Sequence, residues 1–328
     1  MAVIAGTTSC DDFLDREPMS SISPETYYST AAQLEANLND EYPNVLPSFG
    51  QWTYGIFGED KGTDNQIEVN ANDRYTQDRW KVPHSESDNW KFERIYRINF
   101  FLSEALPKFG EDMSGSQNTI SGSVATIKHY IGEMYFLRAY EYFKKLQLFG
   151  DFPIIDQPLA DEMEALREAS KRFPRNEVAR FIISDLDKAY AYMSDVDMAT
   201  TRINKDAAML VKSRVALFEA TWLQNFKGTA FVPGGEGWPG ASLHNNYQYP
   251  SGNLDNEVKY FLEQAVEASK LVADKYKGNL TENTGVLQQS ADDPSNPYFD
   301  MFAQEDLSDV KEVLLWRQYA RGLSTHNI

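Results

Sequence analysis

The stretch GEMYFLRAYEYFKKLQLFGDFPII, residues 132–155, carries the clearest fold signal in the chain. Apolar residues recur in it every three or four positions, which is the spacing of one face of an α-helix. The same pattern continues upstream and predicts a helix from about residue 120 to residue 149. One side of this helix carries Ile127, Ile131, Tyr135, Tyr142, Leu146 and Phe149. The turn Gly150-Asp151-Phe152-Pro153 ends it, because glycine and proline interrupt helices.

Apolar residues with the same helical spacing also occur before and after this stretch, and they predict further helices. They cover residues 89–109, 176–193, 204–226 and 254–276, and an earlier helix is capped by Ser23 and ends before Pro43. Residues 312–319, EVLLWRQY, mix β-branched and aromatic side chains and predict a strand. The expected fold class is mostly α, with degenerate tetratricopeptide-like helix pairs, long loops and minor β. Within residues 176–276 the helix pairs resemble such an array without a strict repeat of about 34 residues.

Composition limits the possible functions. The chain has 328 residues and a net charge of −18, which argues against binding to nucleic acid or to anionic lipid headgroups. No stretch is apolar enough to span a membrane. The sequence lacks the short motifs of metalloproteases, serine hydrolases, nucleotide-binding loops and dinucleotide folds. No enzyme activity, cofactor or metal is therefore expected, since the four histidines also lack ligand spacing: His84, His129, His244 and His326.

Two loops rich in glycine and proline carry unusually many aromatic rings. The first, around residues 50–80, contains Trp52, Tyr54 and Trp80, and the second, around residues 231–250, contains Trp238, Tyr247 and Tyr249. Such a ring either pins its loop to the core or faces a ligand. A flat ring can lie against the C–H face of a sugar, and Asp64, Asn65 and Arg74 could bond its hydroxyls. The predicted ligand site therefore comprises Trp52, Tyr54, Asp64, Asn65, Arg74, Trp80, Trp238 and Tyr247.

The only cysteine, Cys10, follows a run of small residues. A buried structural cysteine is uncommon this close to a terminus. A catalytic thiol would need a base nearby, whereas Asp11 and Asp12 adjoin this one. The third alternative is a lipidated cysteine, as at the processing site of a bacterial lipoprotein, although no complete secretory signal precedes it.

Several stretches, taken in order, resemble the SusD/RagB family of Bacteroidota surface lipoproteins. They are CDDFLDREP and NDEYPN near the start, IYRINFFLSEAL at 95–106, residues 132–155, FIISDLDKAYAYM at 181–193 and TRINKDAAMLVKSRVALFEATW at 201–222. The Gly-Glu-x-x-Phe-Leu-Arg-Ala-Tyr helix that ends in Phe-Gly-Asp-x-Pro is the most specific of these. In it, we expect Phe136, Leu137, Ala139 and Tyr140 in the core. We expect Arg138 to form a structural salt bridge or to cap backbone carbonyls.

The resemblance implies a surface-exposed lipoprotein of the outer membrane, anchored only by lipid on Cys10. It implies a SusC-like TonB-dependent transporter as partner and an oligosaccharide or polysaccharide as ligand, bound without catalysis. Residues 1–10 would be a residual signal and lipidation segment, and residues 11–328 a single helical domain that lacks the family's C-terminal part. The alternatives are a helical-repeat scaffold that binds only protein, a peptide-binding relative, and a glycosidase.

Overall fold

The computed structural model describes residues 27–47, 66, 89–110, 112–193, 198–287, 289–290 and 292–319. The described helices are α3 (Ala31–Val45), α4 (Glu93–Phe109), α5 (Val124–Phe149), α6 (Met163–Ala169), α7 (Arg175–Tyr192), α8 (Lys205–Asn225), the 3-10 helix η2 (Pro239–Ser242), α9 (Leu254–Tyr276) and α10 (Pro297–Met301). Two isolated bridges, Thr30 with Ser121 and Phe152 with Phe173, are the β contacts between described residues. The prediction of a mostly α fold is confirmed.

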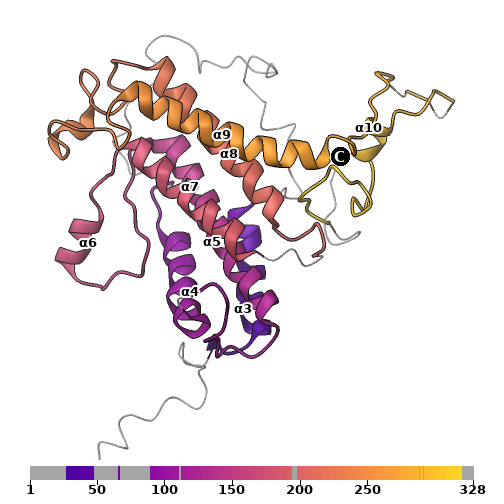
Figure 1. Cartoon of the computed structure of the whole chain (residues 1–328), viewed down its shortest axis with the longest axis horizontal. Helices are drawn as coiled ribbons and strands as arrows, with labels where there is room; N and C mark the ends of the chain where they lie inside the picture. The colour runs from indigo at the N-terminus through magenta and orange to yellow at the C-terminus, as the bar shows by residue number, and fades with distance from the viewer. Residues whose placement is uncertain are drawn as a thin grey trace, which may run out of the picture.

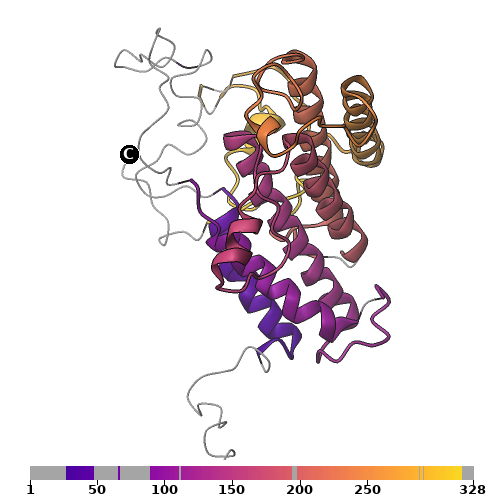
Figure 2. The ribbon, with the colours of Figure 1, turned by 90° about the vertical axis from the view of Figure 1, so that its left-hand side faces the viewer.

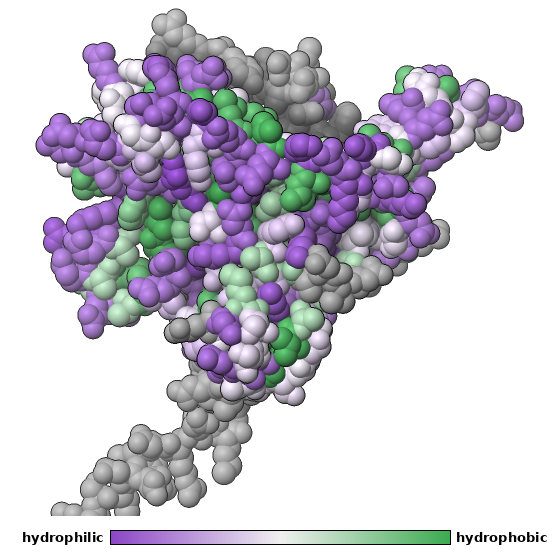
Figure 3. Space-filling model, in the orientation of Figure 1, coloured by the Kyte–Doolittle hydropathy of each residue, from purple (hydrophilic) through white to green (hydrophobic). Residues whose placement is uncertain are grey.

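The long helices pack side by side in an array, whereas α6 and α10 stand away from it (Figure 1). Helix α5 contacts α3, α4 and α7, while α7 contacts α8, and α8 contacts α9. Turned by 90°, the array has α3 at one edge and α9 at the other (Figure 2). Hydrophilic side chains predominate on the face shown in Figure 3, and the apolar side chains drawn there in colour form small separate patches. The core therefore lies between the helices, with α5 at its centre.

Helix α5 is buried on nearly all sides because apolar residues occupy more than one of its faces. A helix of this kind is stable only inside a protein. Gly132 lets the C-terminal end of α7 approach α5 closely, since a Cβ there would lie 2.7 Å from Met193 Cγ and 2.9 Å from the Ala189 carbonyl oxygen. Gly150 ends the helix with a positive φ of 68°, which glycine adopts without steric cost.

Three ion pairs join neighbouring helices of the array; two are fully buried, and the third is half-buried on its arginine side. Arg138 on α5 holds Asp185 on α7 through two bonds of 2.6 and 2.8 Å. Helix α7 is joined to α8 by Arg175 and Glu219 at 2.8 Å, and to α9 by Arg180 and Glu257 at 2.7 Å. A buried charge is tolerated only with such a partner. The prediction that Arg138 is structural is confirmed.

Several predicted boundaries were wrong. Residues 312–319 form no strand, because no neighbouring strand accepts their backbone hydrogen bonds among the described residues. Pro43 lies inside the last turn of α3 instead of after it. The described start of α3 is a capping box at Thr30, and the predicted start at Ser23 lies outside the described residues. The short helices α6 and α10 were not predicted, because neither is long enough to show a period.

Candidate functional site

An open groove of about 870 Å³ lies between the helix array and the segment 312–318, and we call it the α3–α8 groove. Its walls come from the second half of α3 and the first half of α8, its floor from Phe136 and Tyr140 on α5, and its remaining side from the segment 312–318. Ligand cavities of proteins commonly measure about 300–1,000 Å³. The groove thus has the size of a small-molecule site.

Aromatic rings and aliphatic side chains supply most of its apolar lining. Tyr140 stacks on Phe136 with ring planes 9° apart and centroids 6.1 Å apart. Trp316 is fixed by two bonds to Thr200, one from its indole N–H to the hydroxyl at 2.8 Å and one from its backbone N–H to the carbonyl at 3.1 Å. The Asn204 side chain donates a further bond of 2.6 Å to the Leu314 carbonyl. These contacts hold the irregular segment against α8.

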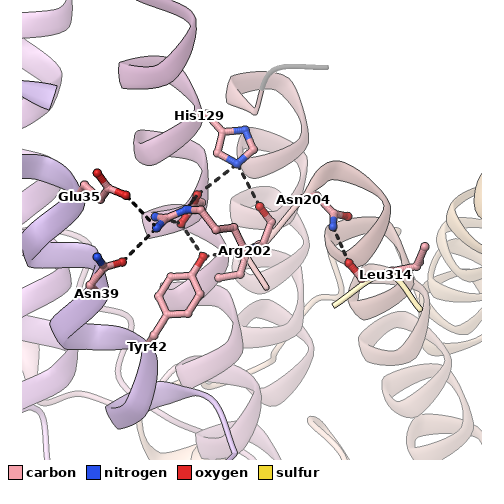
Figure 4. A network of polar contacts seen from close by, with 9 residues as sticks. Glu35, Asn39, Tyr42, His129, Arg202, Asn204 and Leu314 are labelled. Atoms are coloured by element: carbon pink, nitrogen blue, oxygen red, sulfur yellow. Dashed lines mark hydrogen bonds and ion pairs between the residues drawn. The ribbon is translucent and has the colours of Figure 1, made fainter. Parts of the chain in front are cut away.

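A closed polar network around Arg202 includes two residues that line the groove, Asn39 and Tyr42 (Figure 4). Arg202 donates bonds of 2.8 and 2.9 Å to Glu133 and one of 3.0 Å to Asn39. The Tyr42 hydroxyl donates to Glu133 at 2.5 Å and accepts the Ile203 backbone N–H at 2.9 Å. Burial and the nearby Glu133 carboxylate raise the pKa of Tyr42 well above its usual value. Because its members satisfy one another, this network fixes Tyr42 and Asn39 at the groove.

Other polar groups in the groove have no partner among the described residues. Arg214, exposed on α8, forms no ion pair there. The Tyr140 hydroxyl forms no hydrogen bond with any described residue, and burial raises its pKa while Arg214 lowers it. Glu312 has a buried carboxylate oxygen, Oε1, without a hydrogen-bond partner. The groove therefore offers unused donors and an unused acceptor beside aromatic surface.

Most of the residues predicted as ligand contacts lie outside the described residues: Trp52, Tyr54, Asp64, Asn65, Arg74 and Trp80. The same holds for Cys10. The structure brings the remaining two, Trp238 and Tyr247, together with ring centroids 5.5 Å apart. This pair lies in the loop between α8 and α9, and neither ring lines the α3–α8 groove.

A ring in a loop was expected either to pin the loop to the protein or to face a ligand, and Trp238 pins its loop. Its side chain is 5% exposed, and its indole N–H donates a bond of 2.7 Å to Asp151 at the end of α5. It does not stand on the surface, as the predicted stacking platform requires. Tyr247 is half-buried, and its hydroxyl bonds Asn176 at 2.9 Å. Burial is the main cause that raises the pKa of Tyr247.

Sequence reasoning missed the groove. It placed Tyr140 in the core with Phe136, Leu137 and Ala139; these three are buried, but Tyr140 is half-buried at the groove floor. Trp316 was assigned to a strand, and Arg214 lies among ordinary exposed helix residues. No local signal identifies them, because segments more than 70 residues apart in the sequence (140, 214 and 312) form the site together.

Metal and membrane features can be judged only for the described part of the chain. There, no group of three or more His, Cys, Asp or Glu side chains is placed to hold a metal ion. Within the same residues, no helix has the length and apolar character needed to cross a membrane.

Comparison with known proteins identifies the family. The SusD-like family model, described as "Starch-binding associating with outer membrane", matches residues 12–217. Since the match covers more than half of the chain, this protein belongs to the SusD-like family. The resemblance drawn from the sequence motifs is thereby confirmed.

The individual relatives have low sequence identity to this chain. SusD-like protein P2 of Formosa agariphila is 26% identical over 235 residues, which are 68% of this chain and 43% of the relative. SusD-like protein P25 of the same organism is 25% identical over 233 residues, 65% of this chain and 41% of the relative. The chain thus spans less than half the length of these curated relatives. A solved SusD-like carbohydrate binding protein from Bacteroides fragilis is 16% identical, with a TM-score of 0.44 over 79% of this chain and 42% of that one.

Proposed function

We propose that this chain binds glycans at the surface of the outer membrane and passes them to a SusC-like TonB-dependent transporter. The observation that carries the proposal is the match of residues 12–217 to a family described as starch-binding and associating with the outer membrane. A solved SusD-like neighbour is titled a carbohydrate binding protein. The protein would act by binding alone, without a cofactor and without catalysis.

The chemistry of the chain supports glycan binding in two places. The loop residues Trp52, Tyr54, Asp64, Asn65, Arg74, Trp80 and Tyr247 remain predicted contacts, which combine rings for stacking with planar polar groups for hydroxyls. The α3–α8 groove offers the same combination on rigid helices. Binding need not be tight for delivery, since a Kd of about 1 mM corresponds to about −4 kcal/mol.

Cys10 is the proposed lipid anchor. A single acyl chain gives only marginal membrane binding, whereas two or more acyl chains hold a protein stably. Replacing Cys10 with Ala in the full precursor should move the protein from the membrane fraction to the soluble fraction. An unchanged membrane fraction would exclude this anchor without bearing on glycan binding.

A glycan array with the full-length protein tests the central proposal, with a heat-unfolded sample as control. Selective binding to one class of polysaccharide supports it. Purification from the native envelope in mild detergent tests delivery, where near-stoichiometric recovery of a TonB-dependent transporter is expected. Array binding without a co-purifying transporter would point to a free-standing glycan binder, and no array binding would overturn the ligand assignment.

A further inference from the structure

The α3–α8 groove contains three polar groups whose hydrogen-bonding capacity is unused within the described part of the chain. They are the Arg214 guanidinium, the Tyr140 hydroxyl and the Glu312 Oε1 atom. The third is the most informative, because a buried acceptor without a partner destabilises the folded protein. A native protein usually keeps such a group only where a water, an ion or a ligand satisfies it.

We infer that the α3–α8 groove is a binding subsite for a neutral oligosaccharide, in which Glu312 accepts a hydrogen bond from a sugar hydroxyl and Tyr140 and Arg214 contact neighbouring hydroxyls. The inference rests on the proposed glycan-binding function and assigns that function to a particular site and ligand class. None of these three residues belongs to the loops in which the sequence predicts ligand contacts.

A sugar fits the groove because each of its hydroxyl groups both donates and accepts hydrogen bonds. The groove needs both properties, since Glu312 requires a donor and Arg214 requires an acceptor. The lining also includes the Trp316 ring and the Tyr140 ring, which is half-buried. Such rings can pack on the apolar C–H face of a sugar, whereas a purely apolar ligand would leave the Glu312 oxygen unsatisfied.

A neutral sugar fits better than an acidic one. A uronic acid could pair with Arg214, but it would bring a second carboxylate into a groove that already contains the unpaired carboxylate of Glu312. Like charges in a partly buried site repel each other strongly. The net charge of −18 adds a field that opposes the approach of anionic chains. A neutral hydroxyl satisfies Glu312 without this repulsion.

The helices and the segment that carry the subsite groups are held in place before a ligand arrives. Tyr140 and Arg214 project from α5 and α8, which belong to the same packed array. The segment that carries Glu312 and Trp316 is tied to Thr200 and Asn204 by hydrogen bonds of 2.6–3.1 Å. Sites built on rigid elements lose less entropy on binding.

The test is calorimetric titration of the full-length protein with four probes. Maltoheptaose, laminarihexaose and xylohexaose represent neutral oligosaccharides, and trigalacturonic acid represents acidic ones. The variants are Tyr140→Phe, Glu312→Gln and Arg214→Gln. Tyr140→Phe is the sharpest, because it removes only a hydroxyl that has no partner in the described part of the protein. Arg167→Gln, at an exposed arginine on α6 that does not line the groove, is the matched control.

We expect the parent to bind at least one neutral probe. Tyr140→Phe should weaken that binding about 2- to 10-fold, the loss of one neutral hydrogen bond. Glu312→Gln and Arg214→Gln should each weaken it about 10-fold or more, because they remove charge-assisted bonds. Arg167→Gln should bind as the parent does. All four variants should keep the parent Tm, so that a loss of affinity cannot be ascribed to unfolding.

The other outcomes separate the subsite from the general function. If the parent binds a neutral probe and all three groove variants bind it equally well, the subsite is wrong while glycan binding stands. If the parent binds trigalacturonic acid in preference to every neutral probe, the ligand class is wrong. If the parent binds none of the four probes, the subsite proposal is overturned, whereas the glycan-binding function is decided separately by the glycan array.

Discussion

The interior of the helix array and the α3–α8 groove contain the same kinds of side chain but use them in opposite ways. In the interior, Arg138 meets Asp185 and Arg175 meets Glu219, and all four side chains are buried. In the groove, Arg214 and Glu312 lie without an ionic partner in the described part of the chain. The type of residue therefore does not indicate whether it supports the fold or is available to a ligand. The presence or absence of a partner within the protein does.

This difference separates stability from binding. A charge that is paired inside the protein contributes to the geometry of the fold, and removal of its partner leaves a buried charge. A polar group without a partner at an open groove contributes little to the fold and remains available to a ligand. Substitutions of the same chemical type at the two places should therefore affect different measurements.

The largest effect is expected for Arg138→Ala. This variant leaves the Asp185 carboxylate, which is 0% exposed, without its bidentate partner, so the free energy of unfolding should fall by about 3–5 kcal/mol. Arg214→Ala should change it by about 0.5 kcal/mol or less. Urea unfolding followed by circular dichroism measures both. Equal losses for the two arginines would show that the groove arginine is structural after all.

Two tryptophans make the next comparison. Trp238→Phe keeps a ring but loses the indole bond to Asp151, so we expect a loss of about 1.5–3 kcal/mol, as for a hydrogen bond to a charged group. Trp316→Phe loses its bond to the Thr200 hydroxyl and should cost about 0.5–1.5 kcal/mol. Thermal unfolding with matched protein concentrations provides the measurement. A Trp238→Phe protein as stable as the parent would contradict the pinning role of this ring.

Two tyrosines that are two residues apart on α5, and so point to different sides of the helix, sharpen the comparison further. The Tyr142 hydroxyl accepts the Ile155 N–H at 2.8 Å and donates to the Ile155 carbonyl at 3.0 Å. Tyr142→Phe should therefore cost about 1–3 kcal/mol, because the N–H is left unsatisfied. Tyr140→Phe should cost about 0.5 kcal/mol or less. Both values come from the same denaturant series, and a reversed order would refute the assignment of the two hydroxyls.

The smallest effect on stability is expected at acid pH, and it concerns the ion pair Arg180–Glu257 that joins α7 to α9. Burial raises the pKa of Glu257, but hydrogen bonds from Arg180, Asn176 and Ser251 outweigh burial and hold the pKa below the ordinary value of 4.5. A carboxyl group whose pKa is lowered by folding stabilises the protein above its unfolded pKa. This contribution is lost as the pH falls below about 4.5 and through the folded pKa.

We therefore expect the Tm to fall on acidification below this pH, and part of that fall to disappear in Glu257→Gln, which should be less stable than the parent at neutral pH. Arg214→Gln should follow the parent profile, since Arg214 makes no contact at this interface. A Glu257→Gln variant whose Tm falls on acidification as steeply as the parent's would show that other groups cause the acid sensitivity.

Much of the fold follows from local sequence. The period of residues 132–155 predicted the central helix, and the predicted range 254–276 coincides with α9. Arg138 could be assigned a structural role because a charged residue within an apolar helix must find a partner. The motif set also indicated the SusD-like family, to which the match of residues 12–217 assigns the chain. These features are local or periodic, so a single sequence contains them.

Tertiary structure alone decided which side chains are paired. Trp238 looked like a ligand ring because it lies in a loop rich in glycine and proline, yet it is buried and bonded to Asp151 in the distant turn after α5. Tyr140 and Tyr142 look alike in sequence, but only Tyr142 reaches the Ile155 backbone. The groove forms where residues 140, 214 and 312 meet. Neither composition nor periodicity predicts these contacts, because the burial and the hydrogen-bond partners of a side chain depend on segments far apart in the chain.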